Sequence, residues 1–257
     1  IEQALKDNGI GTNLLTYDTV YRTGIQLKEY VEDGHDPAAP YYRKGSAASH
    51  LSAQEIDALD LEEIGLVHVT GIPPALSKEA REATYRLMER AREAQIPVTF
   101  DPNLRPALWE NGETMRNVLN DLANYADVVL PGIGECEILA GTTDKEKAAD
   151  FYHQKGAALV VIKDGKNGAY VSEKKENGEV VRDMIPGYPV KKVVDTVGAG
   201  DGFAVGVLSG LLKGLPVTEC AKRGNAIGSI QVQHRGDNEG LPTEEILQSY
   251  MAGNIQK

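Results

Sequence analysis

The chain has 257 residues, of which 41% are hydrophobic and 25% charged, the composition of a folded protein that can build one large core. Its net charge of −11 leaves no basic field for a phosphate backbone, so we expect no nucleic acid partner. No apolar run approaches the roughly 18 residues of a membrane span, and the cysteines and histidines lack metal-ligand spacing; we therefore expect a cytoplasmic protein without a protein metal cage.

The first fifty residues predict a short helix followed by a small β subdomain. Residues 1–8 are typical of the tail of a helix that Gly9 ends, from which we expect that the chain starts partway through a larger protein and lacks an N-terminal part of the fold. Residues 10–50 show no helical period but contain the extended stretches 23–27 and 41–43. We interpret them as a β lid on a single domain that spans residues 1–257.

From Gly65 onward, β-branched runs alternate with helix-like stretches, which predicts an α/β fold with a mostly parallel sheet. Pro73 and Pro74 are expected to break the chain after the first strand, and Ser77 to cap a helix that runs to about Ala94. The expected parallel strands are residues 65–70, 96–100, 127–130 and 158–162.

After the parallel strands, the sequence predicts an antiparallel hairpin and then a buried helix. Residues 169–184 predict an antiparallel hairpin, in which the Asn177-Gly178 pair favours a type I′ turn. Residues 188–194 are expected to be extended, and residues 198–212, poor in charge and rich in small residues, to form a buried helix.

The most informative stretch is Asp195-Thr-Val-Gly-Ala-Gly-Asp201-Gly-Phe, where an extended segment passes through small residues into that helix. The backbone amides of Gly198, Ala199 and Gly200, at the positive end of the helix dipole, could form an anion hole for a phosphoryl group. Asp201 beside them could accept a proton from an attacking hydroxyl. The alternative, an acidic helix cap after a glycine turn, explains the same local pattern.

Residues 195–203 resemble the D-T-x-G-A-G-D signature of the ribokinase-like (PfkB) carbohydrate kinases. The resemblance implies a ribokinase-like sandwich with helices on both faces of the sheet, ATP and Mg²⁺ as cofactors, and Asp201 as the catalytic base. It also implies that Asp195 helps to hold a monovalent cation such as K⁺.

Three further segments resemble the nucleotide and metal side of that family. Leu130-Pro-Gly-Ile-Gly-Glu135 is similar to its N-x-x-E segment, which implies that Glu135 positions Mg²⁺ through water, although Gly132 replaces the asparagine. Lys163, Gly165 and Gly168 match a strand-end element beside the nucleotide, and Asn225 lies in the helix that flanks the adenine. A solvated helix-start glutamate, a plain strand–turn–strand and a polar residue on a packed helix are the respective alternatives.

The substrate side resembles the 2-keto-3-deoxygluconate kinases of the family. Arg105 lies in a D-P-N-x-R loop after a strand and suits a carboxylate, although a salt bridge to Asp101 would account for it equally well. Tyr41 and Arg43 belong to a Y-Y-R-x-x-S-A-A segment whose counterparts reach from the lid to the sugar acid. The alternatives are a solubilising edge-strand pair for these two residues and a surface turn for Asp237, an acid that contacts substrate in this subgroup.

The resemblance therefore predicts ATP-dependent phosphorylation of the 6-hydroxyl of 2-keto-3-deoxygluconate. The expected partners are a sugar acid and ATP, and a second copy of the chain could pair through the lid. A kinase of a neutral sugar such as fructose, or a non-catalytic nucleotide- or sugar-binding relative, would retain much of the same sequence.

Overall fold

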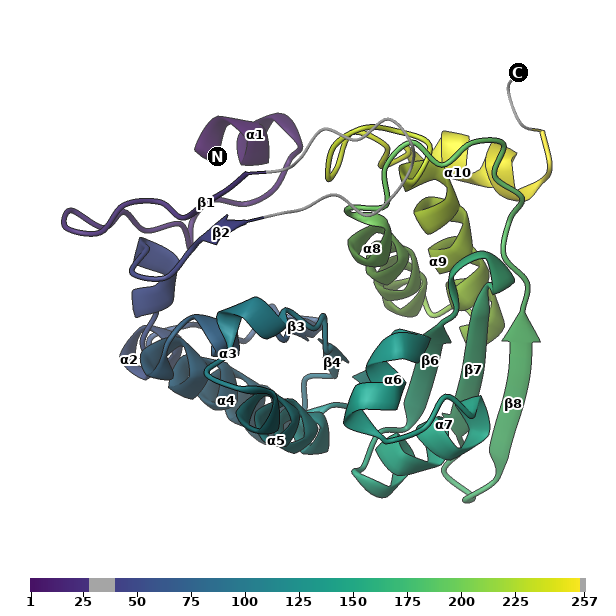
Figure 1. Ribbon diagram of the computed structural model, residues 1–257, viewed down its shortest axis with the longest axis horizontal. Coiled ribbons are helices and arrows are strands. Elements are labelled where there is room, and N and C mark those ends of the chain that lie inside the picture. The colour runs from purple at the N-terminus through teal and green to yellow at the C-terminus, as the bar shows by residue number, and fades with distance from the viewer. Residues whose placement is uncertain (28–39, 255–257) are drawn as a thin grey trace.

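A six-stranded sheet organises the computed structural model, which describes residues 1–27 and 40–254 (Figure 1). Its strand order follows the chain, and the first four strands are parallel while the last two form an antiparallel hairpin. The mostly parallel α/β sheet predicted from the sequence is confirmed. The strands are β3 (Val67–Thr70), β4 (Val98–Asp101), β5 (Val128–Val129), β6 (Leu159–Lys163), β7 (Ala169–Lys174) and β8 (Val180–Ile185).

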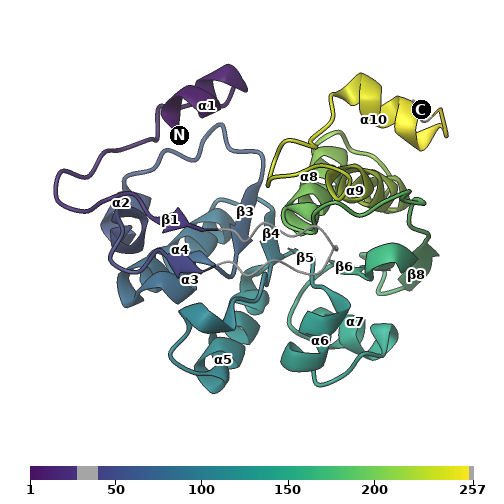
Figure 2. The same cartoon turned by 45° about the horizontal axis from the view of Figure 1, so that its top comes forward.

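Alternating side chains along these strands divide the core between the two faces of the sheet. Phe100 and Ile162 pack against one group of helices, whereas Leu130 and Val161 pack against the other. Figure 2 shows α8 and α9 on the opposite side of β5 and β6 from α6 and α7, as the family resemblance implied. The first face carries α4 (Lys78–Glu93), α5 (Gly112–Leu122), α6 (Ile133–Leu139) and α7 (Lys145–Gln154); the second carries α8 (Ala199–Leu212) and α9 (Val217–Gln231).

The remaining α-helices are short. Within residues 1–27 and 40–254 they are α1 (Glu2–Asp7), α2 (Ala53–Asp57), α3 (Pro73–Leu76) and α10 (Glu244–Met251), of which the last packs on α9. No helix in the described part of the chain is long and apolar enough to cross a membrane.

The chain after β3 differs from the prediction. Pro73 and Pro74 do not break the chain but begin α3, because the first residues of a helix need no N–H partner and proline has the required φ. Ser77 then caps α4 as expected, since its side chain accepts the N–H of Ala80 at 2.9 Å.

The hairpin between β7 and β8 is confirmed, but its predicted type I′ turn is wrong. That turn needs a positive φ at both central residues. Gly178 has a φ of +85°, whereas Asn177 does not have a positive φ, and the N–H of Gly178 donates to the carbonyl of Lys175. The loop is therefore a longer one in which a left-handed glycine restores the pairing.

The helix that was predicted to be buried is buried on one side only. Phe203 and Val207 of α8 are packed in the core, while Val205 is 47% and Leu212 64% exposed. Residues 188–194, which were predicted to be extended, belong to no strand of the sheet.

The small β subdomain predicted for residues 10–50 is present as β1 (Ile25–Gln26) and β2 (Tyr41–Tyr42), a separate antiparallel pair. Gln26 and Tyr41 are directly opposite each other in its register. Residues 28–39 of the predicted lid lie outside the described residues. Figures 1 and 2 show β1 and β2 apart from the main sheet, on the side of α2 and α3.

Candidate active site

The carboxyl ends of β4 and β6, the start of α8 and the two lid strands enclose a cavity of about 540 Å³. Loops at the carboxyl ends of parallel strands are where α/β sheets place their ligands. The cavity brings together most of the predicted site residues, from segments far apart in the sequence: Tyr41, Arg43, Arg105, Glu135, Lys163, Gly198, Gly200, Asp201 and Asp237.

The start of α8 depends on a glycine at position 198. Gly198 has a φ of +81°, and a Cβ there would lie 2.3 Å from the carbonyl oxygen of Asp237. The N–H groups of Gly200 and Asp201 donate no hydrogen bond to the described residues, so they are available to an anion. The predicted amide of Ala199 is not, because it donates to the carbonyl of Thr196 at 3.3 Å and does not line the cavity.

An ion pair crosses the floor of the cavity between two strand ends. The Nζ of Lys163, at the end of β6, lies 2.6 Å from the Oδ2 of Asp101, at the end of β4. Burial by itself lowers the pKa of Lys163, but the negative charges of Asp101, Glu135 and Asp201 outweigh it, and the net pKa is raised. Lys163 therefore carries a positive charge at neutral pH, beside the start of α8.

Glu135 is held by backbone amides on both sides. Its Oε2 accepts the N–H of Gly132, the N-cap residue of α6, at 2.6 Å, and its Oε1 accepts the N–H of Leu104 at 2.8 Å. Each oxygen keeps a lone pair, so the carboxylate can still accept a hydrogen bond from a metal-bound water. No group of three or more His, Cys, Asp or Glu side chains suited to a metal occurs among the residues that the structure describes.

The lid contributes the guanidinium of Arg43, which is oriented by Gln26 and Tyr41. The Nη2 of Arg43 donates to the Oε1 of Gln26 at 2.7 Å, and the guanidinium lies 4.9 Å from the ring centre of Tyr41. Arg105 faces the same cavity from the loop after β4, where its Nη1 donates to the carbonyl of Leu104. Two guanidinium groups in one cavity suit a small carboxylate.

The alternative interpretation of Arg105, a salt bridge to Asp101, is not what the structure shows. The Oδ2 of Asp101 binds Lys163, and its Oδ1 accepts the N–H of Asn103 at 3.1 Å. Neither of these bonds involves Arg105, and its guanidinium faces the cavity instead.

Of the predicted nucleotide residues, Lys163 lines the cavity, whereas Gly165, Gly168 and Asn225 lie outside it. The backbone at Gly168 approaches the end of β8 so closely that a Cβ there would lie 2.0 Å from the carbonyl oxygen of Ile185. The side-chain amide of Asn225 donates to the carbonyls of Ile185 and Pro186, at 3.0 and 3.1 Å. Gly168 and Asn225 thus both contact residues 185–187. Asn225 is a buried polar residue on a packed helix, as its alternative interpretation described. Gly165 lies in the turn after β6 with a φ of +51°.

Asp195 does not line the cavity. Its two carboxylate oxygens accept the N–H groups of Val197, at 3.0 Å, and Gly236, at 3.2 Å. These bonds connect the segment before α8 to the loop that carries Asp237.

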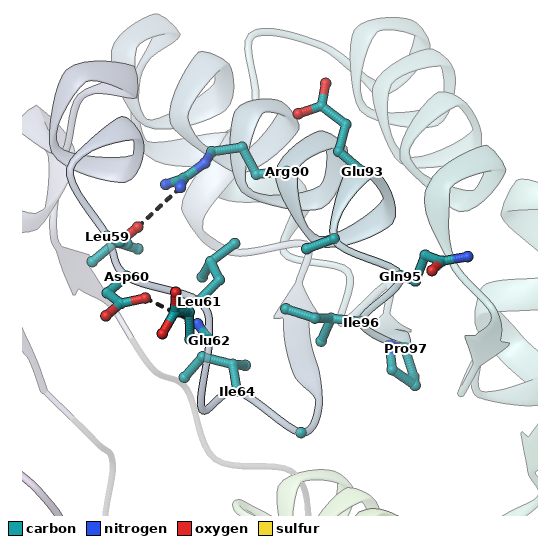
Figure 3. Close-up of a pocket in the computed structure, with 12 residues that line it drawn as sticks. Leu59, Asp60, Leu61, Glu62, Ile64, Arg90, Glu93, Gln95, Ile96 and Pro97 are labelled. Carbon is teal, nitrogen blue, oxygen red and sulfur yellow. Dashed lines mark hydrogen bonds between the residues drawn. The ribbon is translucent and has the colours of Figure 1, made fainter.

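A larger cavity, of about 740 Å³, lies at the other end of the sheet, where residues 59–65 meet residues 90–97 (Figure 3). None of the predicted site residues lines it. Its one arginine, Arg90, donates hydrogen bonds to backbone carbonyls, including that of Leu59 at 2.9 Å. The smaller cavity is therefore the candidate active site.

Among the cavity residues that were not predicted as site residues, Gln26, Asp101 and Asn103 contribute polar side chains to its geometry. Asp101 and Asn103 belong to the D-P-N segment at the end of a strand, so their position was a usable signal. Asn103 adopts a φ of +41° and its amide approaches the carboxylate of Asp201 at 3.5 Å. Gln26 contacts Arg43 because it lies opposite Tyr41 in the strand pair, a long-range contact that the local sequence does not show.

Comparisons with known proteins show the family and the fold of the chain. A family model described as pfkB family carbohydrate kinase matches residues 1–244. The chain is 47% identical over 253 residues to a 2-dehydro-3-deoxygluconokinase of Bacillus subtilis, covering 98% of this chain and 76% of that one. A PfkB protein from Polaromonas superposes with a TM-score of 0.84 at 44% identity, covering 96% and 78% of the two chains. A fructokinase from Vibrio cholerae, bound to fructose, ADP and calcium, superposes with a TM-score of 0.86 at 26% identity, covering 97% and 80%.

Proposed function

Because the chain belongs to the pfkB family of carbohydrate kinases, we propose that it transfers the γ-phosphoryl group of ATP to the 6-hydroxyl of 2-keto-3-deoxygluconate. The observation that carries the proposal is the content of one cavity: Asp201 and the open amides of α8 at one part, and the guanidinium groups of Arg43 and Arg105 at another. The first part suits phosphoryl transfer and the second a carboxylate. A sugar acid is the substrate that uses both.

In the proposed reaction, Asp201 accepts the proton of the 6-hydroxyl as its oxygen attacks the γ-phosphorus. The new O–P bond forms while the bond between that phosphorus and the leaving oxygen of ADP breaks. The amides of Gly198, Gly200 and Asp201, together with the Lys163 ammonium, stabilise the charge on the transferred group.

The sugar acid is oriented by the lid and the loop after β4. Arg105 and Arg43 bind its carboxylate, Tyr41 contacts the chain of the sugar, and Asp237 accepts a hydroxyl hydrogen bond. Asn225, Gly165 and Gly168 form the nucleotide side, where residues 185–187 give the adenosine a backbone surface.

Kinases of this family use ATP with a divalent metal. The Glu135 carboxylate supplies hard oxygen ligands of the kind that Mg²⁺ prefers, and the backbone bonds that both of its oxygens already accept favour contact with the ion through water. Such an ion would offset the charge of the phosphates.

The test is ATP-dependent phosphorylation with 2-keto-3-deoxygluconate, fructose and ribose compared at equal concentration. We expect a strong preference for the keto acid that collapses in Arg105→Ala, and a loss of turnover in Asp201→Asn with nucleotide binding retained. Preference for a neutral sugar, insensitive to Arg105→Ala, would assign a fructokinase-like activity instead. Nucleotide binding without turnover on any sugar would indicate a non-catalytic relative.

Three other expectations remain predictions: that residues 1–257 form one domain, that the protein is cytoplasmic, and that copies pair through the lid. Light scattering of the purified protein measures the last of these directly.

A further inference from the structure

Asp101 performs two separate tasks with its two oxygens. Oδ1 accepts the N–H of Asn103 and so shapes the loop that carries Arg105, whereas Oδ2 accepts a hydrogen bond from the Lys163 ammonium at 2.6 Å. Asp101 is 2% exposed, so its carboxylate depends on these partners for hydrogen bonding. A change that removes only one of the two tasks can separate them.

Lys163 needs a fixed position if it is to act on a phosphoryl group. A lysine side chain has several rotatable bonds, and its ammonium is a point charge without the planar geometry of a guanidinium. Here the ammonium lies 3.9 Å from where a Cβ of Gly200 would be, against the open amides of α8. An ammonium has three N–H donors, so one bond to Asp101 leaves two for an anion.

We propose that Asp101 is a positioning residue that holds the Lys163 ammonium against the start of α8, where the phosphoryl group is transferred. The inference rests on the proposed kinase function. It gives Asp101 a role in catalysis although its carboxylate touches neither reactant.

The other carboxylates near Lys163 cannot take over this task. Both oxygens of Glu135 accept backbone amides, and their bonds would break if the side chain turned toward Lys163. Asp201 is needed as the base, and a close bond to an ammonium would weaken it as a proton acceptor.

The charge on Lys163 depends on every group that faces it. Burial opposes that charge, and only the nearby carboxylates stabilise it. Removing the charge of Asp101 therefore lowers the pKa of Lys163. The titratable groups that act on Lys163 or respond to it are Asp101 of β4, Glu135 and Cys136 of α6, Asp201 of α8 and His68 of β3.

The test is Asp101→Asn, which keeps an oxygen for the N–H of Asn103 but places an uncharged amide opposite Lys163. We expect kcat to fall by about 100-fold, the effect of misplacing a reacting group by about an ångström. The KM for the sugar acid should stay within about twofold, because the Arg105 loop is retained. The activity should also begin to fall at a lower alkaline pH than in the wild type, as Lys163 loses its proton.

The matched control is Asp164→Asn. Asp164 forms an ion pair with Lys145 at 2.8 Å, only one residue beyond Lys163 but outside the cavity. The Asp164→Asn variant should keep the kcat and the pH profile of the wild type. A Lys163→Met variant completes a double-mutant cycle, in which the Asp101→Asn change should add little once Lys163 is gone.

Several results would overturn the inference: a KM for the sugar acid that rises while kcat is unchanged, an equal effect of Asp164→Asn, or additive effects in the cycle. Calorimetry of ATP binding without sugar separates this inference from the proposed function. If the wild type phosphorylates no sugar, the proposed function fails. In that case, ATP binding that is about tenfold weaker in Asp101→Asn than in Asp164→Asn would still support the inference that Asp101 positions Lys163. Equal ATP affinities would then refute it.

Discussion

Replacing Gly198 by alanine tests whether the start of α8 is set by its contact with Asp237. A non-glycine residue in the left-handed region costs about 1–2 kcal/mol. The added Cβ would also lie 2.3 Å from the Asp237 carbonyl oxygen, where carbon–oxygen contacts are normally about 3.3 Å or more. One of the two backbone segments must therefore move by about an ångström, and such overpacking adds about 1–3 kcal/mol.

Gly178→Ala is the matched control, because Gly178 has a φ of +85° and open space within 4 Å of its Cβ position. Gly178→Ala should lower the free energy of unfolding only by the cost of placing a non-glycine residue in the left-handed region, without the steric cost. Thermal unfolding should place Gly198→Ala below Gly178→Ala by about 2–4 °C for each additional kcal/mol. The same movement displaces the anion hole from Asp237, so kcat for the sugar acid should fall about 100-fold in Gly198→Ala alone.

If the two variants unfold at the same temperature and both keep the wild-type kcat, the contact between α8 and Asp237 is not tight, and the reasoning fails. A loss of stability without a loss of kcat would show that the contact is structural and does not set the anion hole.

Three other predictions concern separate parts of the molecule. Gln26→Ala should raise the KM for the sugar acid several-fold with little change in kcat, because Arg43 loses the bond that directs it; steady-state kinetics with the acid and with ATP varied separately will show this. Glu244 accepts bonds from Arg223 and its neighbours, which hold its pKa well below the ordinary 4.5, so its contribution to stability is present above pH 4.5 and is lost as the pH falls. Glu244→Gln should therefore be less stable than wild type in urea unfolding at about pH 7, with the difference shrinking at about pH 3. Replacing KCl by choline chloride at equal ionic strength should lower turnover if a cation binds at Asp195, and an unchanged rate would remove that assignment.

The parts of the site that the sequence predicts well are those in which local sequence determines local geometry. The segment from Asp195 to Asp201 contains its own glycine turn, helix start and acid, so the position of Asp201 in the cavity followed from a few adjacent residues. The parallel strands were predictable for a similar reason, because each β-branched run is followed by a helix-like stretch, although their order in the sheet was not predicted.

Contacts between distant segments could not be predicted in this way. Lys163 and Asp101 are 62 residues apart, and their ion pair exists because β4 and β6 end at the same edge of the sheet. Arg105 is close to Asp101 in sequence, and without the fold that closeness suggested the wrong partner. Asn225 presents a similar difficulty, since only the path of the chain after β8 brings two carbonyls to its amide.

The two hydrogen bonds of Glu135 have a consequence for the behaviour of the cavity as a whole. One carboxylate connects the loop before α6, through Gly132, to the loop after β4, through Leu104, the neighbour of Arg105. A ligand that moves the Glu135 carboxylate at the phosphate end therefore also changes its bond to Leu104, and with it the position of the loop that faces the sugar acid. Thermodynamic linkage makes that influence equal in both directions, so the two ligands of this cavity are expected to bind cooperatively rather than independently.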